Sequence, residues 1–363
     1  MQILASSSLS SVIFCLILTL LYVVPLYLIP SSVRKLNRND PIHIKYRLII
    51  SSLFTLYMIL LCYILYSNNI QPWDYNSTIS LLLSSSSLSS SSLSSSSSSL
   101  SSLSSLSSLS PPSFFTLIGL RYDNILECLM ITLLLFLLFY LGVIITNTIY
   151  IIILCYYNVT IYGTLIKKMH NVSIITIIND KVNEYLSQYS TIALIRNFIS
   201  ATITEEIVFR ALMIPVLYKS WVLESSLSLS SSSPWIVILS CPIFFGIAHV
   251  HHCIEEIRNG SKVLVAIMRT VVQITYTSIF GFIAALLFMR TGNLISPLVA
   301  HIICNFFGLP DIGFMSKSSS ELSFLYPYRY FLLFLHALGL ILFSNTIMML
   351  TDNTSKTSFY WKY

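Results

Sequence analysis

Long apolar runs recur along the whole chain, with short polar segments between them. About 20 apolar residues in a helix cross the hydrocarbon core of a bilayer, where a helix satisfies its own backbone hydrogen bonds. Charged residues make up 9% of the chain, against about 25% in an ordinary soluble domain. The pattern predicts an all-α fold, a polytopic transmembrane helical bundle of about eight helices. The expected helices cover approximately residues 12–30, 47–66, 125–157, 195–219, 235–250, 263–289, 293–308 and 330–350.

The first and third runs differ from the others. The first has no basic region before it and no small-residue cleavage site after it, so it is expected to be a retained transmembrane helix or signal anchor. The third is too long for a straight crossing. Its part after Asn147 is therefore expected to tilt, bend or follow the membrane interface.

Basic residues set the expected orientation. The loop after the first helix contains five basic residues and one acidic one, namely Arg34, Lys35, Arg38, Lys45, Arg47 and Asp40. By the positive-inside rule this loop lies in the cytoplasm, which places the amino terminus in the lumen. The alternation then also puts residues 167–196 and the loop with Arg258 and Lys262 in the cytoplasm.

Composition argues against two further kinds of binding. The net charge of +6 comes mainly from loops between the apolar runs, so nucleic-acid binding is not indicated. The seven cysteines lie mostly in apolar segments and form no CxxC pair. Neither a disulfide framework nor a zinc-thiolate site is therefore expected.

Two tracts have very low complexity. Residues 80–110 contain only leucine and serine, and a shorter serine-rich copy covers residues 225–233. Their leucines recur irregularly and cannot cover one face of a helix. Both tracts are therefore expected to be disordered on the lumenal side.

Two adjacent glutamates and an arginine interrupt the fourth apolar run, in the order Thr204-Glu205-Glu206-Ile207-Val208-Phe209-Arg210. A charge at the centre of a membrane helix costs about 2.5 to 3.5 kcal/mol on insertion scales, so such residues pair, face a wet cavity or do chemistry. Glu206 and Arg210 are four residues apart and share a helix face. Glu205 projects about 100° away, free to act as a general base for water. A structural ion pair that locks two helices accounts for this motif equally well.

Two later segments supply polar partners. His249 ends the fifth helix after Pro242 and Gly246, which indicate a bend or a close approach of a neighbouring helix. His301 and Asn305 lie four residues apart on the seventh helix, so both point to one face and form a plausible oxyanion clamp. Each segment alone is also compatible with an interfacial or helix-to-helix hydrogen bond.

The motifs together resemble the CAAX prenyl protease 2 family, the Ras-converting CAAX endopeptidases of a wider intramembrane protease superfamily. The resemblance extends over about residues 119 to 310 and is weak in the amino-terminal helices. The matching blocks are Arg196-Asn197, Thr204 to Ala211, Cys241 to His252, Gln273 to Gly281, Arg290 to Ile295 and His301 to Phe306. The serine-rich tracts have no counterpart in the family.

The resemblance implies an intramembrane endopeptidase that removes the last three residues from prenylated CAAX proteins. It implies a location in the endoplasmic reticulum membrane, with the site open toward the cytoplasm. Its expected partners are farnesylated or geranylgeranylated CAAX proteins such as Ras-like small GTPases, and the lipid bilayer. No cofactor is expected.

Roles for single residues follow from the matched motifs. Glu205 and His249 are expected to activate a water molecule, and His301 and Asn305 to stabilise the oxyanion. Glu206 and Arg210 are expected to support them. The chain then divides into residues 1–118, with the amino-terminal helices and the Leu/Ser loop, a catalytic core at residues 119–310, and a carboxyl-terminal loop, helix and tail at residues 311–363.

Two other functions are compatible with the same residues. Glutamates and histidines that meet in a cavity also bind zinc, although the HExxH pattern of zinc proteases is absent from the sequence. The wider superfamily also includes proteins proposed to act without catalysis, so the chain can also be read as a membrane protein that binds lipidated partners.

Overall fold

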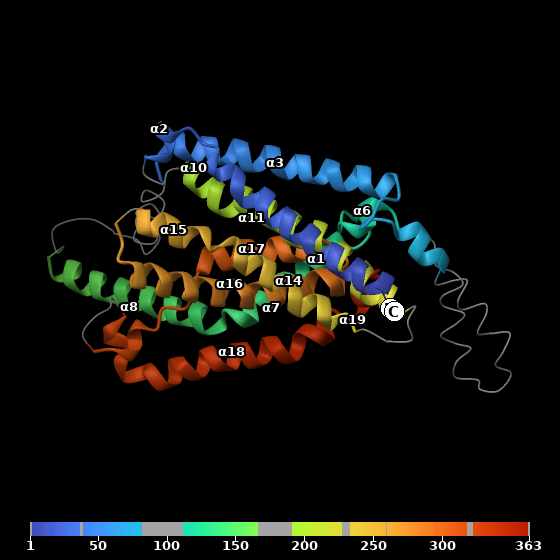
Figure 1. Cartoon of the computed structure of the whole chain (residues 1–363). Coiled ribbons are helices and arrows are strands. Elements are labelled where there is room, and N and C mark those ends of the chain that lie inside the picture. The colour runs from blue at the N-terminus through green and yellow to red at the C-terminus, as the bar shows by residue number, and fades with distance from the viewer. Residues whose placement is uncertain are drawn as a thin grey trace, which may run out of the picture. The chain divides into compact units, whose positions relative to one another are not determined.

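The regular structure of the described residues is helical throughout (Figure 1). The structure is a computed structural model and describes residues 2–36, 39–81, 112–165, 191–226, 233–258, 260–317 and 322–361. The all-α prediction is confirmed. Residues 82–110 and 227–232, which hold most of the two low-complexity tracts, lie outside the described residues, as do Arg38 and residues 166–190.

Five helical stretches among the described residues are long and apolar enough to cross a membrane: Ser8–Tyr27, Pro41–Ser67, Trp235–Arg258, Val263–Thr291 and Ser323–Thr357. A sixth candidate is a pair of helices, α7 (Ile125–Phe139) and α8 (Leu141–Leu165), bent by 65° at the break between them. These spans confirm a polytopic membrane bundle. The bend lies at Tyr140, before the predicted point at Asn147.

The chain forms two compact units. The first contains residues 1–129, 200–301 and 351–363, and the second contains residues 130–199 and 302–350. These units are groups of residues in contact, and each contains separate stretches of sequence. They do not test the predicted division of the sequence into three parts, which stays a prediction.

The first unit is built on four packed helices. In it α1 (Gln2–Val23) runs beside α3 (Pro41–Ser67) and against α14 (Trp235–Ala248) (Figure 1). α14 in turn packs along α16 (Val263–Thr291). Four free cysteines are buried in this unit, at Cys15, Cys62, Cys128 and Cys241.

Two glycines allow α14 and α16 to approach closely. A Cβ on Gly246 of α14 would lie 2.8 Å from Ser278 Oγ of α16. A Cβ on Gly281 of α16 would lie 3.2 Å from Pro242 Cβ of α14. The close approach expected from Pro242 and Gly246 is therefore present, and it brings the end of α14 against α16.

The segment with the two glutamates alternates between α-helix and π-helix. Its elements in order are α10 (Thr191–Leu194), π-helix η2 (Ile195–Ser200), α11 (Ala201–Glu206), π-helix η3 (Ile207–Leu212), α12 (Met213–Tyr218), π-helix η4 (Lys219–Leu223) and α13 (Glu224–Ser226). Single π-helical turns inside α-helices occur frequently at functional sites. In η4, the side chain of Lys219 forms a buried ion pair with Glu224 and also donates a hydrogen bond to Gln71 Oε1 over 2.9 Å.

A tight turn fixes the start of α17 (Ile295–Phe307). α16 ends at Gly292, whose φ of 61° is the left-handed conformation typical of a helix C-terminus. Asn293 Oδ1 then accepts the backbone N–H of Ile295 over 3.0 Å. Leu294 N also donates to Gly119 O over 2.9 Å. These bonds set the direction in which α17 leaves the turn and so the position of His301 on it.

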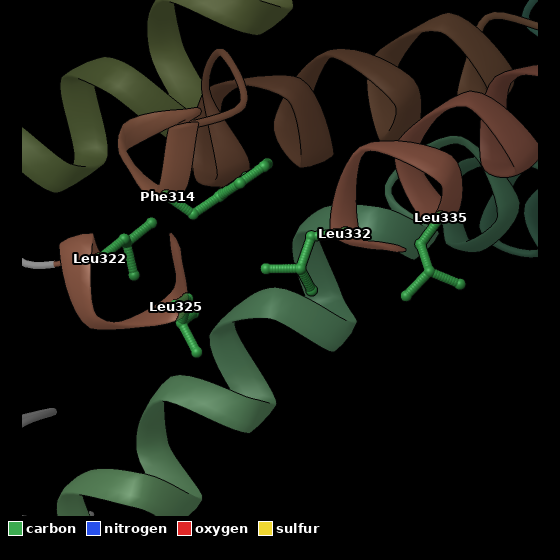
Figure 2. Close-up of a cluster of buried hydrophobic side chains, with 5 residues drawn as sticks. All are labelled: Phe314, Leu322, Leu325, Leu332 and Leu335. Atoms are coloured by element: carbon green, nitrogen blue, oxygen red, sulfur yellow. The ribbon is translucent and has the colours of Figure 1, made fainter. Parts of the chain in front are cut away.

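The second unit has its own apolar core (Figure 2). It joins the loop before α18 (Arg329–Leu350), the first turns of α18 and side chains of α8. α18 and α8 pack closely, since a Cβ on Gly142 would lie 2.5 Å from the ring of His336. The core residues are Phe314, Leu322, Leu325, Leu332 and Leu335, packed against Ile145, Ile149, Tyr150 and Ile153.

Candidate active site

The two adjacent glutamates lie at the junction between α11 and the π-helix η3, inside the first unit. Glu206 and Arg210 are completely buried, and Arg210 Nη1 donates to Glu206 Oε1 over 3.0 Å. The ion pair predicted from their spacing is present. Glu205 is less enclosed, with 18% of its side chain exposed. The two carboxylates thus occupy different environments although they are neighbours in sequence.

His301 lies between the two carboxylates. Its Nδ1 is 2.6 Å from Glu206 Oε1, the same oxygen that accepts from Arg210. Its Nε2 is 3.7 Å from Glu205 Oε2, which is too long for a direct hydrogen bond. Because an ionised carboxylate only accepts, Nδ1 carries a proton, and Nε2 is the nitrogen directed toward Glu205. Glu206 therefore fixes the orientation of the imidazole.

His249 stands at the C-terminal end of α14, close to the same cluster. Its Nδ1 lies 2.8 Å from Phe245 O, and since a carbonyl only accepts, Nδ1 is the donor and the neutral ring keeps a lone pair on Nε2. Glu205 and His301 both act electrostatically on His249. The local hydrogen bond thus selects the tautomer that a general base or hydrogen-bond acceptor needs.

Aromatic rings surround the buried charges. The ring of Phe245 contacts His249 edge to face at 4.9 Å and His301 at 6.4 Å, between centroids. The guanidinium carbon of Arg210 lies 4.4 Å from the same ring and 5.5 Å from that of Phe280. Nε and Nη2 of Arg210 have no hydrogen-bond acceptor among the described residues. The aromatic faces therefore help to hold the cation, and the rings exclude water around it.

Tyr22 is a site residue that the sequence patterns missed. It comes from α1, far from the motifs, and its hydroxyl donates to Glu205 Oε1 over 3.2 Å. Its ring packs edge to face on Phe209, with the centroids 5.5 Å apart. A single tyrosine in an apolar run carries no spacing signal that links it to a glutamate 183 positions away. Nothing in the sequence distinguishes it from a packing residue.

Asn305 belongs to the second unit, one helical turn after His301 on α17. Its side chain is exposed, and its Nδ2 donates to Asn197 O over 2.9 Å. Its predicted place beside His301 in an oxyanion clamp stays a prediction.

The described geometry places four of the predicted residues, Glu205, Glu206, Arg210 and His301, in one buried cluster, with His249 adjacent through Phe245. A carboxylate, a directed imidazole and a second imidazole with a free lone pair are groups that move protons to and from water. Fold and site together define a multi-pass helical membrane protein with a cluster of carboxylates and imidazoles inside its bundle.

Comparison with known proteins agrees with this class. Residues 187–307 match the family model described as Type II CAAX prenyl endopeptidase Rce1-like. This segment is therefore similar to the family that the motifs indicated. No solved structure matches the chain significantly.

Three similar proteins from different organisms are all named CAAX prenyl protease 2. CAAX prenyl protease 2 of Homo sapiens is 37% identical over 159 residues, 44% of this chain and 43% of that protein. The protein of that name from Arabidopsis thaliana is 40% identical over 141 residues, 39% of this chain and 42% of the relative. The Saccharomyces cerevisiae protein is 36% identical over 137 residues, 37% and 40% of the two chains. The chain thus spans about two fifths of the length of the curated relatives it matches.

Proposed function

We propose that this chain is an intramembrane endopeptidase that removes the last three residues from prenylated CAAX proteins. The observation that carries the proposal is the placement of one imidazole, that of His301, between the carboxylates of Glu205 and Glu206 inside an apolar bundle. The names of the relatives, CAAX prenyl protease 2, supply the substrate class.

In the proposed reaction, Glu205 accepts a proton from a water molecule that also donates to the lone pair on His249 Nε2. The oxygen of that water attacks the carbonyl carbon of the scissile peptide bond. The pair of electrons of the C=O bond moves to the oxygen and forms an oxyanion. Glu205 and His249 therefore act as the base and its partner.

His301 and Asn305 are the proposed oxyanion donors. When His301 is doubly protonated, Nδ1–H donates to Glu206 and Nε2–H is left for the oxyanion. The amide Nδ2 of Asn305 supplies the second hydrogen bond. Collapse of the intermediate breaks the C–N bond, and the leaving amine takes the proton from Glu205. The new acid on the prenylated cysteine gives its remaining proton to the amine of the released tripeptide, so the products are a carboxylate and a free tripeptide.

Membrane depth suits a lipidated substrate. A buried prenyl chain gains about 0.8 kcal/mol for each methylene, so the bilayer concentrates both the anchor and the neighbouring peptide bond. We place the protein in the endoplasmic reticulum membrane with the site open to the cytoplasm, where its proposed substrates, such as Ras-like small GTPases, are made. The basic loops support this orientation.

Cleavage of a prenylated CAAX peptide by membranes that contain this chain tests the function. Release of the tripeptide from the prenylated peptide, and little release from its unprenylated twin, is expected. No release above control membranes would favour a non-catalytic protein that binds lipidated partners. Loss of activity on chelation, restored by stoichiometric zinc whose binding Glu205→Gln abolishes, would favour the zinc-dependent mechanism instead.

A further inference from the structure

A second cluster of histidine and carboxylate groups lies just past His249, outside the roles assigned above. α15 (His251–Arg258) begins two residues after His249 and carries His251, His252 and Glu255. Each of these three side chains has a ligand atom, a ring nitrogen or carboxylate oxygen, within 4.8 Å of the other two. All three are partly buried.

The first ligand candidate is already in the tautomer that binds metal. His251 Nδ1 lies 2.6 Å from Ala248 O and therefore carries the proton. Its Nε2 is left with a lone pair, is buried, and has no hydrogen-bond partner among the described residues. A metal-ligating histidine characteristically donates its other N–H to a backbone carbonyl or carboxylate, as His251 does here.

The other two candidates are already at ligand spacing. His252 Nδ1 and Glu255 Oε2 are hydrogen-bonded at 3.3 Å, and a metal ion would take the place of the proton between them. Two ligands on a tetrahedral zinc ion, each about 2.0 to 2.1 Å from the metal, are separated by roughly 3.4 Å. The second oxygen of Glu255, Oε1, is 3.7 Å from Nη1 of Arg47 on α3. Arg47 therefore contacts the carboxylate through Oε1, and Oε2 is the oxygen directed to His252.

We infer that His251, His252 and Glu255 form a binding site for a borderline divalent cation of the Zn²⁺ class. Two imidazoles and one carboxylate are a donor set that suits zinc, with a fourth position for water. The proposed general base Glu205 is not part of this cluster. The site is therefore separate from a zinc-dependent hydrolytic mechanism and does not depend on the proposed cleavage.

An ion held there would act on the end of α14. The rings of His252 and His249 have centroids 5.9 Å apart, so a bound cation fixes the turn that presents His249. It also ties the first turn of α15 together, since its ligands come from positions separated by one helical turn. Zinc is expected to raise the thermal stability of the protein.

Metal binding by the full chain tests the inference. The protein is purified in detergent without an affinity tag, stripped with a chelator, and titrated with Zn²⁺ by calorimetry and with Co²⁺ by visible absorption. One ion per chain with Co²⁺ bands typical of imidazole ligation is expected, together with a higher unfolding temperature. His252→Gln and Glu255→Gln should each weaken binding by more than the roughly 10- to 100-fold that loss of an outer-shell partner costs.

Two control variants locate the ion. Glu256→Gln changes the neighbouring carboxylate, which pairs instead with Arg269 at 3.3 Å, and should bind the ion as the wild type does. Glu205→Gln should also bind it unchanged. The inference is overturned if the wild type takes up no stoichiometric ion, if both His252→Gln and Glu255→Gln retain full affinity, or if Glu205→Gln abolishes binding.

Discussion

The imidazole of His301 is hydrogen-bonded to the carboxylate of Glu206 over 2.6 Å, across two helices and with no exposed surface on the carboxylate. Since the same oxygen accepts from Arg210, Glu206 joins a buried cation and a directed imidazole. Glu206 is thus more than the helix-stabilising partner of Arg210 that the sequence predicted, because it also orients His301.

Glu206→Gln keeps the shape of the side chain and removes its charge. Breaking a buried ion pair costs about 3 to 5 kcal/mol, so a lower unfolding temperature is expected. In the protein that folds, kcat for the prenylated peptide should fall about 10²- to 10³-fold, as for loss of an oxyanion donor, with KM little changed. Thermal unfolding and steady-state kinetics measure the two effects.

Glu224→Gln is the matched control for this variant, since Glu224 forms a buried ion pair with Lys219 in a different cluster. It should lower stability by a similar amount and leave kcat of the folded protein unchanged. Wild-type kcat in Glu206→Gln would show that His301 needs no carboxylate behind it.

Arg210→Lys keeps the charge and removes the planar guanidinium. Arg210 lies over the rings of Phe245 and Phe280, and a lysine ammonium cannot stack on both while it bonds Glu206. Loss of a desolvated cation–π contact predicts about 2 kcal/mol lower stability, measured by thermal unfolding in detergent. Arg269→Lys, in an exposed pair with Glu256, should change stability by at most about 0.5 kcal/mol. If Arg210→Lys and Arg269→Lys lowered stability by the same amount, the rings of Phe245 and Phe280 would have no part in holding Arg210.

Tyr22→Phe removes the hydroxyl that donates to Glu205. A hydrogen bond to a charged group contributes about 1.5 to 3 kcal/mol, so kcat is expected to fall roughly 10- to 100-fold. Tyr27→Phe is the control, since the buried hydroxyl of Tyr27 has no hydrogen-bond partner in the described part of the chain. A kcat for Tyr22→Phe equal to that of the wild type would remove Tyr22 from the site.

Gly281→Leu tests the close packing of α14 and α16. A Cβ at this position would lie 3.2 Å from Pro242 Cβ and 3.4 Å from Phe245 Cδ1. Forcing a larger side chain into this contact should cost about 1 to 3 kcal/mol and displace Phe245, on which both histidines pack. Ile279→Leu, on the exposed side of the same helix, should have little effect on unfolding temperature or kcat. A Gly281→Leu protein as stable and active as the wild type would show that the contact is not required.

Spacing along one helix was readable from the sequence, and contacts between helices were not. Glu206 and Arg210 pair because four residues make one helical turn, and apolar length located the spans. The bond from His301 to Glu206 joins helices 95 positions apart, so no local pattern encodes it. Only the family resemblance predicted that these residues belong to one site.

Other features had no local signal at all. The π-helical turn that holds Arg210 has no marker in the sequence, since its residues, Ile207–Leu212, include neither proline nor glycine. The bend at Tyr140 precedes Gly142, where the backbone meets the ring of His336, a contact made by a helix late in the chain. Likewise, the donor role of Tyr22 depends on how α1 packs.

The most direct test of the account is the rate at which Glu205→Gln releases the tripeptide from a prenylated CAAX peptide. Glu205 is part-exposed and has no ion pair with Arg210, so the variant should fold with nearly wild-type stability. Cleavage by this variant should fall to the level of membranes without the protein, while Glu256→Gln should cleave at the wild-type rate. Cleavage by Glu205→Gln at a rate close to wild type would contradict this prediction.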